Sequence, residues 1–222
     1  MEELSTLQLI SIWTLPVLLA ITVHETAHGW VAFKLGDNTA QQAGRLTLNP
    51  IKHIDLVGTI IVPAVILLLS RLMGSMFIFG WAKPVPVNFR QLRQPRRDMA
   101  LVALAGPGSN LLMAIGWGLL ANIGLLLYND QIELARFLFY MGNAGIFINV
   151  IFMILNLIPI LPLDGGRVLY STLPPNLAEP YGRLEPFGLL ILAFLLVTRV
   201  LEMIMLPLIF FTYQQLSSLV GL

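Results

Sequence analysis

The chain has 222 residues, of which 57% are hydrophobic and only 11% are charged. Its mean hydropathy of +0.81 is far above that of soluble domains, so the composition predicts a protein embedded in a lipid bilayer. A formal net charge of +1 gives no support for nucleic-acid binding, and the absence of cysteine excludes disulfides, thiolate metal ligands and a cysteine nucleophile.

Several apolar stretches are long enough, or nearly so, to span the hydrocarbon core, which takes about 20 residues of helix. They cover residues 7–33, 56–72, 99–127 and 134–161. A fifth stretch, residues 186–219, contains Arg199, Glu202 and Pro207 and is compatible with one tilted helix, a kinked helix or two short pieces. We therefore expect an all-α polytopic membrane protein, with four to six transmembrane or re-entrant helices in one domain covering residues 1–222.

Charged residues between the stretches predict the orientation, because cytoplasmic loops are enriched in Lys and Arg. Arginines precede the third stretch (Arg90, Arg93, Arg96 and Arg97), whereas residues 128–133 include no basic side chain. The third stretch should then run outward, and the fourth should return inward toward Asp164. If Lys34 also lies inside, the end of the first helix reaches the same depth as Asp164, nearer the cytoplasmic side.

This orientation requires an even number of membrane crossings between Lys34 and Arg97. Only residues 56–72 are long enough to provide one. Residues 74–89 contain Gly80, Pro84 and Pro86, so we expect a re-entrant or extended return that is shielded by protein.

The first stretch contains His24-Glu25-Thr26-Ala27-His28, which matches the pattern His-Glu-x-x-His. Residues four apart share a helical face, so both imidazoles can bind one Zn²⁺ while Glu25 can reach the metal-bound water. A charged group deep in an apolar helix costs about 2.5 kcal/mol or more, which favours a functional role. The alternative is a polar cluster that neighbouring helices satisfy.

A zinc hydrolase usually has three protein ligands and leaves the fourth position to water. The best third candidate is Asp164, because Pro159 and Pro162 must disrupt the helix before it and Gly165 permits a turn after it. A carboxylate at such a broken helix end can point into the bundle. The alternative is that Asp164 caps a helix that follows it.

These residues together resemble the site-2 protease family of intramembrane zinc metalloproteases. The family pattern is His-Glu-x-x-His in a first core helix, followed late in the chain by Asn-x-x-Pro-x-x-x-x-Asp-Gly, here Asn156 to Gly165. Residues 105–110 (Ala-Gly-Pro-Gly-Ser-Asn) resemble the family's Gly-Pro-x-x-Asn at the start of its middle core helix. Residues 44–50 (Gly-Arg-Leu-Thr-Leu-Asn-Pro), with His53 and Asp55, are similar to the segment after the first helix in a compact bacterial and archaeal branch.

The resemblance implies that His24, His28 and Asp164 bind one Zn²⁺ and that Glu25 is the general base, which later donates its proton to the leaving amine. It also makes Asn156 a candidate to orient substrate or stabilise the tetrahedral oxyanion. The alternative for Asn156 is a hydrogen bond to a neighbouring helix.

Four further features carry expectations. His53 is a candidate for contact with substrate or a proton path, or else a loop histidine with its own partners. Asn110 is expected to tie the Gly-Pro turn to adjacent helices. A short extended or β segment at residues 44–49 could pair with an unwound substrate. Glycines such as Gly116 and Gly118 are expected to allow close helix packing.

The resemblance implies hydrolysis of peptide bonds in or near transmembrane segments of membrane-anchored proteins, that is, regulated intramembrane proteolysis in a cell (inner) membrane. No segment is long enough for the accessory soluble domains that many relatives carry, so the means of substrate selection stays open, as does the oligomeric state. A rival hypothesis is a metal-binding membrane transporter or sensor, in which the same side chains bind a passing ion. A purely structural scaffold does not explain polar residues at such costly depth.

Overall fold

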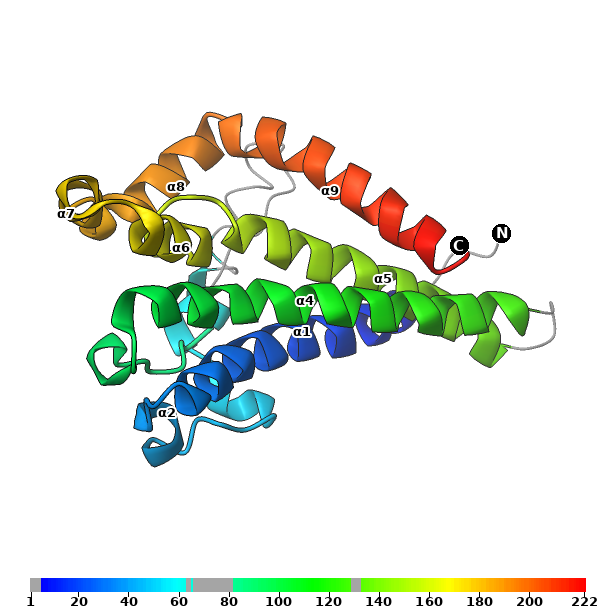
Figure 1. Ribbon diagram of the computed structural model, residues 1–222. Coiled ribbons are helices and arrows are strands. Elements are labelled where there is room, and N and C mark those ends of the chain that lie inside the picture. The colour runs from blue at the N-terminus through cyan, green and yellow to red at the C-terminus, as the bar shows by residue number, and fades with distance from the viewer. Residues whose placement is uncertain (1–4, 63–64, 66–81, 129–132) are drawn as a thin grey trace.

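The computed structural model describes residues 5–62, 65, 82–128 and 133–222, and within them the regular elements are all helical (Figure 1). The long helices are α1 (Thr6–Lys34), α4 (Pro95–Leu126), α5 (Glu133–Asn156) and α9 (Val200–Leu219). The shorter ones are α2 (Thr39–Gln42), α6 (Asp164–Thr172), α7 (Pro175–Gly182) and α8 (Gly188–Val197). Single turns lie at η1 (Pro50–His53), η2 (Leu56–Ile61), η3 (Phe89–Gln91) and η4 (Glu185–Phe187).

Helices α1, α4 and α5 run side by side and form the core of the molecule, with α6 packed on α4 and α9 packed on α5 (Figure 1). Helix α1 starts with a capping box, in which Ser5 and Gln8 satisfy each other's backbone amides. Within the described residues, five helical stretches are long and apolar enough to cross a membrane: Thr6–Lys34, Pro95–Leu126, Glu133–Asn156, Pro175–Val197 and Val200–Leu219. The prediction of an all-α polytopic membrane protein is confirmed.

Close packing of α4 against α5 depends on glycine. A Cβ added at Gly142 would lie 2.5 Å from the backbone nitrogen of Ala121, so no larger residue fits without separating the helices. The sequence pointed instead to Gly116 and Gly118. Gly118 does face Val220, but Gly116 faces open space and supports no close contact.

The fifth apolar stretch is two helices, which decides among the alternatives left open by the sequence. Helix α8 ends before Arg199, whose backbone adopts the left-handed conformation with φ 62°, and α9 starts at the next residue. Pro207 lies inside α9 and Glu202 lies in its first turn, so neither of them breaks the helix.

Helix α5 ends at Asn156, earlier than the predicted limit of residue 161, because Pro159 cannot continue the helical hydrogen bonding. A turn at the Gly-Pro pair was also wrong, since α4 passes through Gly106 and Pro107 without interruption. The β segment expected at residues 44–49 is not confirmed, because these residues form turns and irregular backbone.

Part of the predicted second crossing lies outside the described residues, namely residues 63–64 and 66–72, as do residues 74–81 of the expected return. In the described remainder of that return, residues 82–88 are non-helical and pack against α1 at Gly29, and Phe89 begins η3.

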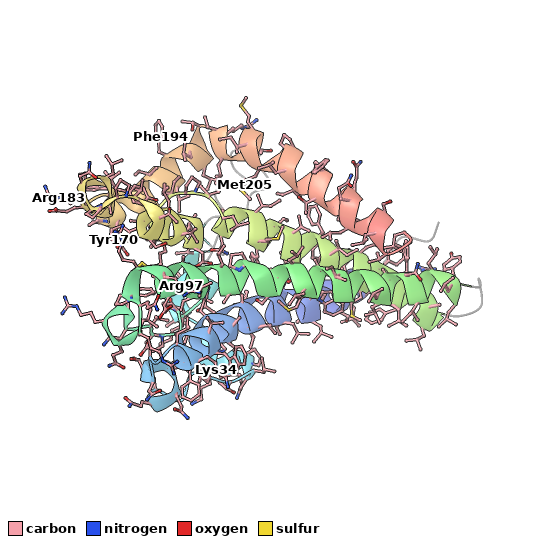
Figure 2. The ribbon with its side chains drawn as sticks, in the orientation of Figure 1. Lys34, Arg97, Tyr170, Arg183, Phe194 and Met205 are labelled. Carbon is pink, nitrogen blue, oxygen red and sulfur yellow. The ribbon has the colours of Figure 1, made fainter. Side chains whose placement is uncertain are left out.

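Several basic residues lie at one end of the helices, although Arg136 is in the first turn of α5 at the other end. Figure 2 shows Lys34, Arg97 and Arg183 toward the end that carries α6 and α7, whereas the end of α9 lies at the other (Figure 1). The beginning of α4 and the end of α1 therefore lie on the same side, as the charge pattern predicts.

Candidate metal centre

Three side chains from two distant parts of the sequence converge between α1 and the start of α6. The Nε2 atoms of His24 and His28 are 3.0 Å apart, and Oδ2 of Asp164 is 3.3 Å from each of them. All three ligand atoms lie within 4.8 Å of one another. Two points on a tetrahedral shell with bonds of about 2.0–2.1 Å are about 3.3 Å apart, so these separations fit zinc.

Partners on α4 determine which nitrogen of each imidazole faces the centre. His24 Nδ1 lies 2.6 Å from Oδ1 of Asn110, whose Nδ2 group donates to Ala20 O and to Asn149 Oδ1. Because both amide protons of Asn110 are used, its Oδ1 must accept, and His24 Nδ1 carries the proton.

His28 is oriented in the same way, since its Nδ1 donates to the backbone oxygen of Val102 over 2.7 Å. The Nε2 atoms of both neutral imidazoles therefore present lone pairs toward the same point as the Asp164 carboxylate. Three facing acceptors repel one another unless a cation lies among them, so the donor set fits a divalent metal ion.

Burial agrees with this arrangement. His24 is 7% exposed and His28 is 9% exposed, and Oδ2 of Asp164 is buried without a hydrogen-bond partner. Buried polar groups are costly without a partner, and a cation at the centre would supply one for all three.

Gly106 of α4 forms one wall of the centre. A Cβ added there would lie 2.6 Å from His24 Nε2 and closer still to His28 Nε2. The absence of a side chain at Gly106 thus lets both imidazoles lie close to the backbone of α4.

The chain after α5 explains how Asp164 reaches the histidines. Asp164 is the first residue of α6, and Leu163 occupies the cap position without a side-chain hydrogen bond. The alternative that Asp164 caps this helix is therefore not what the structure shows. A Cβ at Gly165 would collide with the backbone of Leu157, so glycine allows α6 to fold back tightly against the turn.

Glu25 lies beside the centre but outside the cluster of three ligand atoms. One of its carboxylate oxygens, Oε2, accepts a hydrogen bond of 2.8 Å from the backbone amide of Val85. It is thus a carboxylate near the centre that does not occupy a ligand position.

The two tentative site residues do not join the cluster. The Asn156 side chain donates to Phe152 O within its own helix. His53 is 2% exposed, and its Nε2 lies 2.9 Å from Thr47 O. The latter contact agrees with the alternative of a loop histidine that has its own partner.

Sequence reasoning missed Asn149, which is fully buried and supports Asn110. A signal was present, because Asn149 is a polar residue in an apolar helix. It lies two turns before Asn156, on the same face.

Comparison with known proteins adds independent information. The chain is 37% identical over 208 residues to "Putative zinc metalloprotease YwhC" of Bacillus subtilis (strain 168), covering 91% of this chain and 88% of the relative. It is 30% identical over 204 residues to "Putative zinc metalloprotease Rip2" of Mycolicibacterium smegmatis, covering 90% and 73%. The chain belongs to the site-2 protease family.

A protein of the same name from Mycobacterium tuberculosis (strain H37Rv) is 32% identical over 182 residues, covering 81% of this chain and 63% of the relative. No family profile and no solved structure matches the chain. The names of these site-2 protease relatives agree with the chemistry of the donor set, which fits zinc. The chain is thus a multi-pass membrane member of a zinc metalloprotease family.

Proposed function

We propose that this site-2 protease is a zinc metalloendopeptidase that cuts membrane-anchored proteins in or near their transmembrane segments. His24, His28 and Asp164 would hold one Zn²⁺, and residues 1–222 would act as one membrane-embedded domain. The observation that carries the proposal is the convergence of two correctly oriented Nε2 atoms and a carboxylate beside Glu25, a carboxylate outside the ligand cluster.

Zn²⁺ polarises a scissile carbonyl and lowers the pKa of water bound to it towards about 7. In the proposed reaction, Glu25 accepts the proton of the attacking water and then donates it to the leaving amine. The carboxylate can do this because it occupies no ligand position. Asn156 remains a candidate to orient substrate, although in the absence of substrate its amide bonds its own helix.

The depth of the centre favours attack close to one membrane surface. At about 1.5 Å per residue, His28 and His24 lie about 9 and 15 Å from the end of α1 at Lys34. Because that end carries the basic residues, we propose that the chain resides in a cell (inner) membrane with its site nearer the cytoplasmic side.

Labelling of introduced cysteines tests this orientation without interference, because the chain contains no cysteine. Gln94→Cys, before α4, should react with a membrane-impermeant maleimide only after the cells are opened. Tyr128→Cys, after α4, should react in intact cells. The reverse pattern would contradict the orientation.

A helical substrate hides its scissile carbonyl in hydrogen bonds, so cleavage should require helix-breaking residues near the cut site. Replacing such residues with strong helix formers should slow cleavage of a membrane-anchored reporter. Unchanged cleavage of the stiffened reporter would argue against unwinding.

The variant Glu25→Gln tests the proposal against the rival of a metal transporter or sensor. We expect purified Glu25→Gln protein to retain one zinc ion and to lose cleavage of a membrane-anchored reporter reconstituted with it. Wild-type cleavage by this variant would refute the peptidase mechanism, and zinc flux through wild-type vesicles without any cleavage would favour transport. Comparing membrane proteins of active and Glu25→Gln cells should then reveal an uncut fragment that identifies the substrate class.

A further inference from the structure

Residues 82–88 form a non-helical segment that lies against the Glu25 turn of α1, and the proposed reaction assigns it no role. Its central residue, Val85, is 6% exposed and donates its backbone N–H to Oε2 of Glu25 over 2.8 Å. A hydrogen bond from an amide to an ionised carboxylate is stronger than one between neutral groups. The position of this segment therefore affects the position of the proposed base.

Arg45 anchors the segment immediately before Val85. Its guanidinium donates from Nη2 to Lys83 O over 2.8 Å and to Pro84 O over 3.4 Å. Arg45 is only 9% exposed, so these bonds are shielded from water. The Lys83 amide donates in turn to His53 O over 2.9 Å.

The His53 side chain fixes the loop that carries these anchors. Its Nε2 lies 2.9 Å from Thr47 O, and the Thr26 hydroxyl of α1 donates to the same oxygen over 2.9 Å. The loop that carries Arg45 and His53 is thus bonded to α1 one residue after Glu25.

The other end of the segment is held as well. The backbone N–H of Asn88 donates to Oδ2 of Asp37 over 2.6 Å, and Asp37 is fully buried. Between the two anchors, a Cβ added at Gly29 would lie 2.7 Å from Cγ1 of Val85, so the glycine lets the segment rest on the backbone of α1. Pro84 and Pro86 restrict the backbone on both sides of Val85.

These contacts connect Arg45, through the Lys83–Val85 backbone, to the carboxylate of Glu25. A glutamate side chain loses rotamer freedom when it is held in one orientation, and a preformed donor reduces that cost at each turnover. We propose that Arg45 is a positioning residue for catalysis: it holds the carbonyls of Lys83 and Pro84 so that the Val85 amide keeps Oε2 of Glu25 in place and leaves Oε1 for proton transfer. The inference rests on the proposed function, in which Glu25 transfers the protons.

Arg45→Met should lower kcat about tenfold or more, while KM stays within about twofold and one zinc per chain is retained. Arg45→Lys should recover part of kcat, since an ammonium group can donate to one of the two carbonyls. Arg97→Met removes an exposed arginine at the start of α4 and controls for the lost charge. Equal kcat values for Arg45→Met and Arg97→Met would overturn the proposal, as would joint loss of zinc and KM.

Val85→Pro and Val85→Ala isolate the amide itself. Both shorten or alter the side chain, but only proline removes the N–H, and a residue before Pro86 already favours the extended backbone that proline accepts. We expect kcat of Val85→Pro to be about tenfold below that of Val85→Ala, at similar KM and zinc content. Equal kcat values for the two variants would overturn the role of the amide.

A double-mutant cycle with Glu25→Asp shows whether Arg45 acts through Glu25. The aspartate is too short to keep the bond to Val85, so Arg45→Met should cost little further activity in that background. The full tenfold loss in both backgrounds would overturn the proposal. Failure of the proposed function would look different, because the wild type would then not cleave the reporter, or Glu25→Gln would cleave it as well as the wild type does.

Discussion

The orientation of the two histidines is set by groups behind them that are already satisfied. Asn110 Oδ1 and the Val102 carbonyl oxygen accept hydrogen bonds from the Nδ1–H groups of His24 and His28, which leaves both Nε2 atoms for the centre. Such partners hold a ligand in the geometry that a metal needs and raise its basicity. Gly106 completes the arrangement by leaving space where any side chain would intrude.

Gly106→Ala should therefore abolish zinc binding, because the added methyl group would take the space between the imidazoles and α4. Metal analysis of the purified protein measures this directly. Gly108→Ala is the matched control, since a Cβ at Gly108 meets nothing within 4 Å, and it should keep one zinc per chain. Stoichiometric zinc in Gly106→Ala would contradict the geometry described.

Asn110→Ala should weaken zinc binding about 10- to 100-fold, because His24 would lose the acceptor that fixes its tautomer. Titration against a chelator of known affinity gives the dissociation constant. Asn122→Ala, on the same helix, removes only a bond to the Gly221 carbonyl and provides the comparison. Equal affinities of the two variants would show that Asn110 does not orient the ligand.

For single residues, the sequence predicts the metal ligands better than the residues that orient those ligands. The spacing of His24 and His28 places them on one helical face whatever the tertiary structure, and counting zinc ligands leads to Asp164. The contacts of Gly106, Asn149 and Val85 depend on how helices and loops face one another. Local pattern does not contain that information.

Among the helices, the break between α8 and α9 at Arg199 gives the most specific prediction. Within the residues that the structure describes, Arg199 is the only non-glycine residue with a positive φ, and it separates α8 from α9. A left-handed backbone costs a residue with a Cβ about 1–2 kcal/mol, and glycine avoids most of that cost.

We expect Arg199→Gly to be more stable than Arg199→Ala by about 1 kcal/mol, because both lose the side chain but only alanine keeps the Cβ. Thermal unfolding in detergent compares the two variants. A higher midpoint for Arg199→Ala would mean that the break between α8 and α9 is not formed in this way.

The presence of long apolar helices was predictable from the sequence, whereas the residues at which they end were harder to predict from apolar length. Apolar length alone extends the fourth stretch to residue 161, whereas the backbone of α5 stops at Asn156, close to the break that Pro159 predicts. The break in residues 186–219 had three candidate sites by sequence. Only Arg199 adopts a backbone conformation that is incompatible with a helix.

At the scale of the molecule, the chain brings together residues 140 positions apart (164 − 24) because α1 and α5 both deliver their ends to the basic side. Charge asymmetry in the loops predicts that shared depth before any contact is known. The extended segment expected at residues 44–49 is not confirmed. Residues 44–53 instead supply Arg45 and His53, which brace the segment beside Glu25.

Binding of one zinc ion by His24, His28 and Asp164 can be measured by zinc K-edge X-ray absorption of the purified wild-type protein. We expect one zinc per chain with two imidazole ligands and oxygen donors at about 2.0–2.2 Å, and loss of one imidazole in His24→Ala. A spectrum without imidazole scattering, or one that His24→Ala leaves unchanged, would contradict it.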